Sequence, residues 1–210
     1  MRFLLSFALS CGLALILAPA QSAEAKERKP PVVGIDMIFY ERFKAVVEAL
    51  QGKRYPELIA ATTAALAMKP DPKNAALLLE TRARAYRQTH QYGAAAEDFA
   101  DWQRIDPRNP LAYNEAAWQA ATCPDGGVRN GRAAVRDATR ACELTHWQNA
   151  SYIDTLAAAY AESGNFARAV ELQQRAVSVG ARTGDDRKVF KEDLHLFEKH
   201  QPIRDAGKTQ

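Results

Sequence analysis

The chain has 210 residues, of which 47% are hydrophobic and 25% are charged, a balance typical of a folded globular protein and not of a disordered chain. Its formal net charge of +3 is only mildly basic. Lys and Arg form no dense block interleaved with aromatic residues, so the sequence gives nucleic-acid binding little support.

Residues 1–23 have the features of a secretory signal peptide. Arg2 supplies a positive start, an apolar run extends to Leu17, and small residues follow in the pattern that a signal peptidase reads. The run is short and interrupted for a membrane span, which needs about 20 apolar residues. We therefore expect an exported protein of the bacterial periplasm, with an uncleaved N-terminal membrane anchor as the alternative. Residues 24–35 are charged and Pro-rich, and we expect a flexible leader there.

From residue 36 onward, apolar residues recur with the spacing of amphipathic helices, and no segment alternates with period two. The sequence therefore predicts an all-α fold. Breaks between the periodic segments divide residues 36–183 into helix pairs spanning about 39–72, 76–109, 110–149 and 150–183. A last helix with one apolar side is expected over 184–200, where it would cap the array, and residues 201–210 would be a tail.

Prolines mark the ends of the first two pairs, because proline cannot continue a helix. They occur in the segments Lys69–Pro72 and Asp106–Pro110. The third pair differs from the others, since its two helices are separated by a longer turn-rich segment, Cys123–Asn130.

Removal of the signal peptide would leave two cysteines, Cys123 and Cys142. An oxidising compartment favours a disulfide between them. However, the predicted helix between them places the two residues about 16 Å apart, whereas a disulfide requires Cα atoms within about 7 Å. The spacing argues slightly against the bond, although the intervening loop could fold back and close the gap.

Two stretches of the chain repeat the same layout of small and aromatic residues. In the pairs at 76–109 and 150–183, Ala83, Tyr86, Tyr92, Ala95 and Phe99 correspond to Ala157, Tyr160, Phe166, Ala169 and Gln173. Self-similarity at a fixed period of 20 to 50 residues, roughly, is typical of a solenoid of stacked helix pairs.

In these residues the chain resembles the tetratricopeptide repeat family, whose unit is a pair of antiparallel helices of about 34 residues. Ala95 with Phe99, and Ala169 with Ala176, match the small and aromatic positions of the family's second helix. Pro107 matches the proline that closes a unit. The match is weaker in the first pair, and the third pair departs most because of its longer internal turn. The resemblance implies an α-solenoid of about four helix pairs plus a capping helix, in which bulk at Ala169 would overpack a helix crossing.

The resemblance also implies a concave face, lined by the first helix of each pair, that binds an extended peptide or a segment of a protein partner. Transferring that geometry selects the following groove candidates: Phe43, Lys44, Val47, Glu80, Arg84, Arg87, Asn114, Trp118, Asp154 and Ala158. Arg84 and Arg87 could pair with a carboxylate and Trp118 could stack on an apolar side chain.

A second interpretation is kept for the same residues. Trp118 could equally be core between repeats, and solvated arginines are the favoured reading of Arg84 and Arg87. The family's dicarboxylate clamp, with a Lys and an Asn on one first helix, is not supplied by Phe43 and Val47.

Residues that would carry catalysis or bind a metal are poorly arranged. The four histidines form no i, i+4 pair, no HExxH or CxxC occurs, and we expect them on the surface. No GxSxG surrounds Ser163, and Gly126–Gly127 lacks the Lys and Ser/Thr of a phosphate loop. We expect no enzymatic activity, no cofactor and no metal. An enzyme would require the loop Cys123–Asn130 to form a site with Cys142.

The sequence thus predicts a non-enzymatic scaffold or adaptor of the bacterial cell envelope that binds a protein or peptide partner in its groove. The alternative is a structural component, anchored by an uncleaved N-terminus, that assembles with itself through the repeats.

Overall fold

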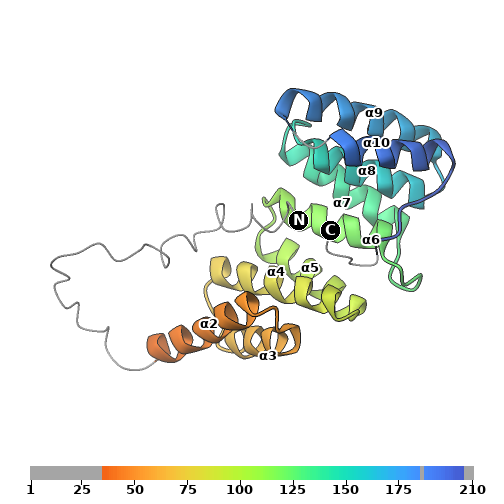
Figure 1. Ribbon diagram of the computed structural model, residues 1–210. Coiled ribbons are helices and arrows are strands. Elements are labelled where there is room, and N and C mark those ends of the chain that lie inside the picture. The colour runs from red at the N-terminus through yellow and green to blue at the C-terminus, as the bar shows by residue number, and fades with distance from the viewer. Residues whose placement is uncertain (1–34, 185–186, 206–210) are drawn as a thin grey trace.

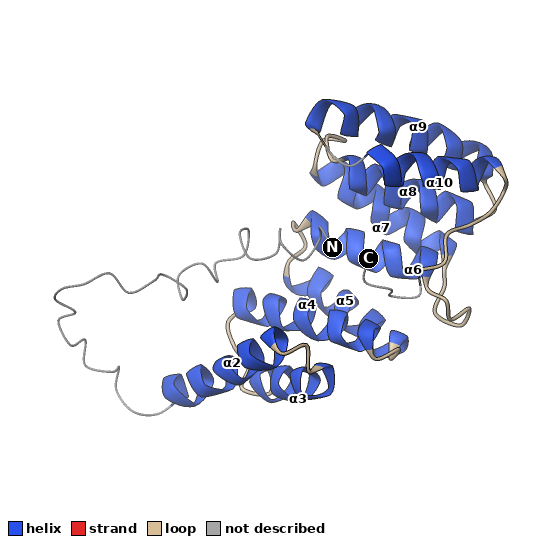
Figure 2. Ribbon diagram, viewed as in Figure 1, coloured by secondary structure: helices blue, strands red, loops and turns tan. Residues whose placement is uncertain are grey.

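The computed structural model describes residues 35–184 and 187–205, and in these ranges it consists of helices and the turns that join them (Figure 1, Figure 2). The predicted signal peptide and most of the predicted leader lie outside the described residues. The helices are α2 (Ile35–Gln51), α3 (Tyr55–Leu66), α4 (Pro72–Gln88), α5 (Tyr92–Ile105), α6 (Pro110–Thr122), α7 (Gly131–Leu144), α8 (Ala150–Glu162), α9 (Phe166–Thr183) and α10 (Arg187–Glu198). The predicted all-α fold is confirmed. Within the described ranges no helix has both the length and the apolar character that crossing a bilayer requires.

Short polar residues begin most of the helices. The first turn of a helix leaves backbone N–H groups without partners, which an Asp or Asn side chain can satisfy. Asp71 accepts from the N–H groups of Lys73 and Asn74 at the start of α4. The other four caps of this kind are Asn109 for α6, Asn130 for α7, Asn149 for α8 and Asn165 for α9.

Several of the helices end in tight turns that contain a left-handed residue. Gly164, with φ of 80°, ends α8, and His90, with φ of 59°, ends α4. In each case the next residue's N–H bonds the carbonyl of an equivalent tyrosine, Tyr160 at 2.9 Å and Tyr86 at 2.8 Å. The two tyrosines, which the sequence places in register, therefore occupy matching positions in the turns inside the second and fourth pairs.

The helices pack as antiparallel pairs, α2 with α3, α4 with α5, α6 with α7 and α8 with α9, and neighbouring pairs stack into an array (Figure 1). Ala95, Ala169 and Ala176 are completely buried in these contacts. Alanine allows two helix backbones to approach closely, and larger residues such as Phe99 and Trp102 fill the wider gaps.

The buried residues form three clusters along the array. The first joins α2, α3 and α4, and the second joins α4, α5 and the first part of α6. The third and largest extends from the second part of α6 to α10. Such division is expected of stacked repeats, in which each unit contacts only its neighbours.

Helix α10 packs against α9 and closes the C-terminal end of the array. Phe190 and Phe197 are buried there, while Val189 is 41% exposed. After α10 the chain turns at His200, whose ring stacks on Phe166 with centroids 5.0 Å apart. Residues 201–205, which we call the tail, then run back past the end of α6 (Figure 1).

Candidate functional site

The first helix of the second pair presents three charged residues along one side. Glu80, Arg84 and Arg87 are spaced by four and three residues on α4, so they lie one above the other. Arg84 Nη2 is 3.2 Å from Glu80 Oε1. The charges thus form a continuous row along this side of α4.

The row is joined to the third pair through Glu115 on α6. Arg84 Nη2 donates to Glu115 Oε1 at 3.2 Å and Arg87 Nη1 donates to Glu115 Oε2 at 3.3 Å. The side chains of Arg87 and Glu115 are only 17% and 16% exposed. Charge-assisted bonds at such partly buried positions are stronger than surface ion pairs, so Glu115 links α4 firmly to α6.

Asp205 of the tail completes the arrangement. Its Oδ2 accepts from Arg87 Nη2 at 2.9 Å and from the indole Nε1 of Trp118 at 2.8 Å. The Asp205 N–H donates to the carbonyl oxygen of Thr122 at 2.8 Å. One carboxylate oxygen therefore receives two donors from the first helices of two different pairs.

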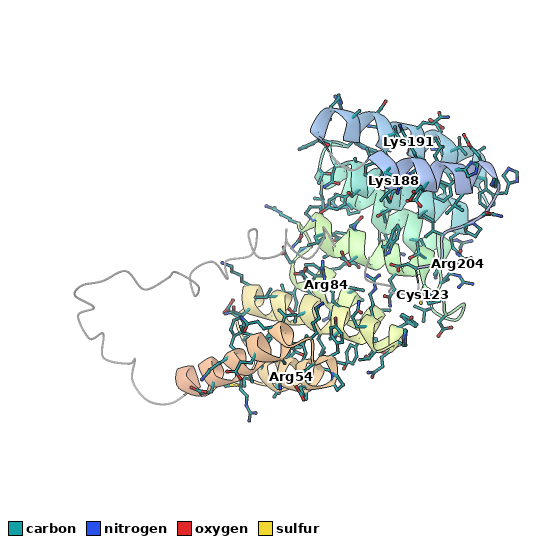
Figure 3. All side chains as sticks on the ribbon, in the orientation of Figure 1. Arg54, Arg84, Cys123, Lys188, Lys191 and Arg204 are labelled. Carbon is teal, nitrogen blue, oxygen red and sulfur yellow. The ribbon has the colours of Figure 1, made fainter. Side chains whose placement is uncertain are left out.

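The residue before it in the tail contacts the first helix of the fourth pair. Arg204 Nη1 lies 2.8 Å from Glu162 Oε2 at the end of α8. Glu162 Oε1 also accepts a hydrogen bond from Arg129 Nε at 3.0 Å. Arg129 Nη1 in turn donates to the carbonyl oxygen of Cys123 at 2.7 Å. The longer loop of the third pair is thereby fixed next to the tail, as the neighbouring positions of Cys123 and Arg204 show (Figure 3).

These contacts define one continuous site, which we call the first-helix face. It comprises Glu80, Arg84 and Arg87 of α4, Glu115 and Trp118 of α6, and Glu162 of α8. Tyr152 of α8 lies near enough for the charges of Glu115 and Glu80 to act on it.

Burial alters the charge of this face. Burial raises the pKa of Glu80 to about 7, against the opposing effect of Arg84 and with a further increase from Glu115. Burial also raises the pKa of Tyr152, and Glu115 and Glu80 add to the increase. Glu80 is thus partly protonated at neutral pH, which leaves the two arginines of α4 with less compensating charge.

The structure brings together four of the residues selected from the sequence, Glu80, Arg84, Arg87 and Trp118. The favoured interpretation of solvated arginines is wrong, because both are engaged in ion pairs and Arg87 is largely buried. Trp118 is core between repeats, the second of the two roles considered for it, and it also contacts the tail. Its ring packs against the third cluster, and its N–H bonds the tail.

The remaining candidates lie elsewhere or are inaccessible. In the first pair, Phe43 packs against the first cluster, Val47 is partly buried and Lys44 is exposed. Asn114 lies on α6 and is partly buried, and its Oδ1 has no hydrogen-bond partner among the described residues.

The prediction that Asp154 lines the groove is wrong, because the residue is buried. Asp154 is 6% exposed, and its carboxylate accepts from the Gln173 amide of α9 and hydrogen-bonds Asp193 of α10. Ala158, at 2% exposed, is likewise core. The capping helix covers this part of α8, so Asp154 positions α10 and is not available to a partner.

Three carboxylates of this arrangement were not selected from the sequence: Glu115, Glu162 and Asp205. Glu115 follows the candidate Asn114 and lies three residues before Trp118, so helical spacing alone would have included it. Asp205 carries no such signal, since 118 residues separate it from Arg87.

The cysteines give no reactive site. Both thiols are unbonded and buried, Cys123 after α6 and Cys142 on α7. Burial raises the pKa of the Cys142 thiol to about 12, so the thiol stays protonated and is a poor nucleophile. The four histidines are exposed, as predicted. The described residues contain no group of His, Cys, Asp or Glu arranged to hold a metal ion.

Comparisons with known proteins identify the fold. No protein-family model and no curated protein matches the chain. A crystal structure of MamA is similar with a TM-score of 0.60 and 15% identity, over 79% of this chain and 87% of that one. A MamA chain from Desulfovibrio magneticus RS-1 gives a TM-score of 0.58 at 14% identity, over 77% and 94%. The chain therefore has a helical-repeat fold of the tetratricopeptide-like kind.

Proposed function

We propose that this chain is a non-enzymatic scaffold that holds an extended segment of a protein partner on its first-helix face. The observation that carries the proposal is the position of the tail. An extended stretch of polypeptide already lies on this face, and its carboxylate, its backbone N–H and its basic side chain each have a specific partner. A surface that binds one extended segment in this way is chemically suited to bind others.

Two further features support the proposal. The residues of the face come from three successive helix pairs, so a bound segment would contact several repeats at once. Arg and Trp at the centre of the face are also the residue types that dominate binding energy at protein interfaces.

A pull-down from an envelope extract of the native host tests the proposal. The bait variant Arg84→Glu/Trp118→Ala disrupts the first-helix face. The matched control, Arg104→Glu/Trp147→Ala, makes the same chemical changes away from it, at an exposed residue of α5 and in the turn after α7. Circular dichroism first establishes that both variants keep the helical content of the wild type.

We expect a partner that wild type and control recover equally and that the face variant recovers about thirtyfold less, the effect of losing a residue worth about 2 kcal/mol. Equal recovery of every protein by all three baits would contradict the proposal.

The proposal includes export to the bacterial periplasm, which is supported by the signal-peptide features of residues 1–23. Intact-mass measurement of the protein from the envelope fraction tests it. A mass that lacks these residues is expected. Their retention would instead favour the anchored structural component.

A further inference from the structure

We propose that the tail is a built-in ligand of the first-helix face, and that the external partner is an extended segment with the same order of side chains, aliphatic, basic and acidic. The partner would displace the tail in order to bind. This inference rests on the proposed function, because it names the chemistry of the partner that the same face accepts.

Two hydrogen-bond donors converge on the acidic position of the tail, Asp205, and recognise its carboxylate. Arg87 Nη2 and Trp118 Nε1 lie 2.9 and 2.8 Å from the same oxygen of Asp205. An indole N–H can only donate and a guanidinium can only donate. Departure of the tail would leave these donors directed at one point, a geometry that selects a carboxylate.

The face also binds the backbone of the tail at Asp205. The Asp205 N–H donates to the carbonyl oxygen of Thr122 at 2.8 Å, at the C-terminal end of α6. The last carbonyls of a helix have no partner within the helix. This end of α6 is therefore an acceptor for the main chain of any extended segment, whatever its side chains.

The two preceding positions set the order of side chains. Arg204 pairs with Glu162, whose carboxylate is held in place from the other side by Arg129. Ile203 packs against the third cluster, on the apolar surface that also receives Trp118 and Phe166. Three consecutive side chains thus enter three chemically different environments.

The tail lies at the surface and stays partly exposed, as a displaceable ligand must. The side chains of Arg204 and Asp205 remain 38% and 24% exposed. A single hydrogen bond between main-chain groups joins residues 201–205 to α6. The tail has one advantage over a partner. It is tethered to the face by the chain itself, which gives it an effective concentration of the order of millimolar. A partner segment must therefore bind more tightly or be present at high local concentration.

The test uses a fluorescent synthetic peptide that copies residues 199–207, with both ends capped so that only side-chain carboxylates are present. Its affinity is measured by anisotropy for the wild-type protein and for Ile203→Ala/Asp205→Asn, in which the tail is weakened. The matched control is Lys199→Ala/Gln201→Ala, two exposed residues that precede Ile203.

We expect the peptide to bind the Ile203→Ala/Asp205→Asn protein at least about tenfold more tightly than it binds wild type or control. That factor corresponds to a tail that occupies the face about nine-tenths of the time. The peptide with Asn in place of Asp205 should bind at least about tenfold more weakly, as should the wild-type peptide when Arg87→Met is added to the protein.

Equal affinity for wild type and Ile203→Ala/Asp205→Asn would overturn the inference, and so would equal binding of the Asp and Asn peptides. A wild-type dimer that the double variant dissociates, seen by sedimentation, would also overturn it, since the tail would then come from a second copy.

The two proposals fail separately. Peptide binding as expected, with no envelope partner that depends on the face, would remove the proposed function alone. Conversely, a partner lost from the Arg84→Glu/Trp118→Ala bait, with no gain on weakening the tail, would remove the inference alone.

Discussion

At the scale of single residues, close approach between helices depends on positions where no larger side chain fits. Gly131 begins α7 where that helix meets the end of α8. A Cβ at this position would lie 3.0 Å from the backbone nitrogen and 3.1 Å from the Cα of Ser163. The Ser163 Oγ, at 2.5 Å, could rotate away, but the backbone atoms can give way only if α7 and α8 shift, so this contact favours glycine.

Gly131→Ala should therefore destabilise the protein by about 1–3 kcal/mol, the usual cost of overpacking. Gly93→Ala is the matched control, because a Cβ there meets nothing within 4 Å. In α5 that change should stabilise by about 0.5–1 kcal/mol, since glycine is a poor helix former. Urea unfolding followed by circular dichroism measures both. Equal effects of the same sign would show that the contact with Ser163 is unimportant.

The site was predicted from the sequence only as far as helical spacing reaches. Arg87 and Trp118 follow from the register of the first helices. Asp205 does not, because the tail has no periodic pattern and its partner is 118 residues away. Asp154 was assigned wrongly for a similar reason, since the position of α10 over α8 is a tertiary contact that the local pattern of α8 does not contain.

At the scale of elements, α10 is docked through polar groups as well as through its phenylalanines. Gln173 of α9 donates to the Asp154 carboxylate and to the Phe190 carbonyl, the latter at 2.9 Å. Burial raises the pKa of Asp154 well above its usual range, and the neighbouring Asp193 raises it further. Burial also raises the pKa of Asp193, to about 6, which a hydrogen bond with Asp154 opposes and Glu192 reinforces.

Raised carboxyl pKa values fix the sign of a pH effect. Between the ordinary carboxyl pKa of about 4 and the Asp193 pKa of about 6, the folded chain binds more protons than the unfolded chain. The pair therefore contributes most to stability at the low end of this range, and its contribution falls as pH rises. Asp193→Asn should make the free energy of unfolding fall less steeply, or rise more, over this range than in wild type.

Urea unfolding of wild type and Asp193→Asn at several pH values from 4.5 to 7.5, roughly, measures the difference in slope. Glu171→Gln is the control, because its side chain on α9 is 66% exposed and lies outside the Asp154–Asp193 pair. The account is contradicted if Asp193→Asn and Glu171→Gln give the same pH dependence.

Element positions were predicted well because the signals for them are local. The second pair, expected to begin near residue 76, begins at Pro72 with α4, an extension that the Asp71 cap and the N-terminal proline explain. Likewise α9 ends at Thr183, directly before Gly184, whose φ is 80°. The packing of these helices into three clusters follows from their stacking and is not encoded in any one of them.

At the scale of the whole molecule, the three clusters predict uneven stability. The third cluster spans α6 to α10 and is by far the largest, whereas the first comprises few residues of α2, α3 and α4. In a linear array the local free energy of opening depends on the unit and its neighbours.

Native-state hydrogen exchange should therefore show the slowest amides in α8 and α9 and the fastest helical amides in α2 and α3. The protection of α4 should be intermediate, since it contributes to the first two clusters. Uniform protection from α2 to α9 would instead indicate a single cooperative core.

The central claim is that the first helices of successive pairs form one face that binds an extended segment through its carboxylate. The indole N–H signal of Trp118 in a ¹⁵N NMR spectrum reports this most directly, because that group donates to Asp205 at 2.8 Å. Ile203→Ala/Asp205→Asn should shift the Trp118 signal while leaving those of Trp102 and Trp147 in place, and the capped 199–207 peptide should return it toward the wild-type position. A Trp118 signal that is the same in both proteins and does not respond to the peptide would contradict the account.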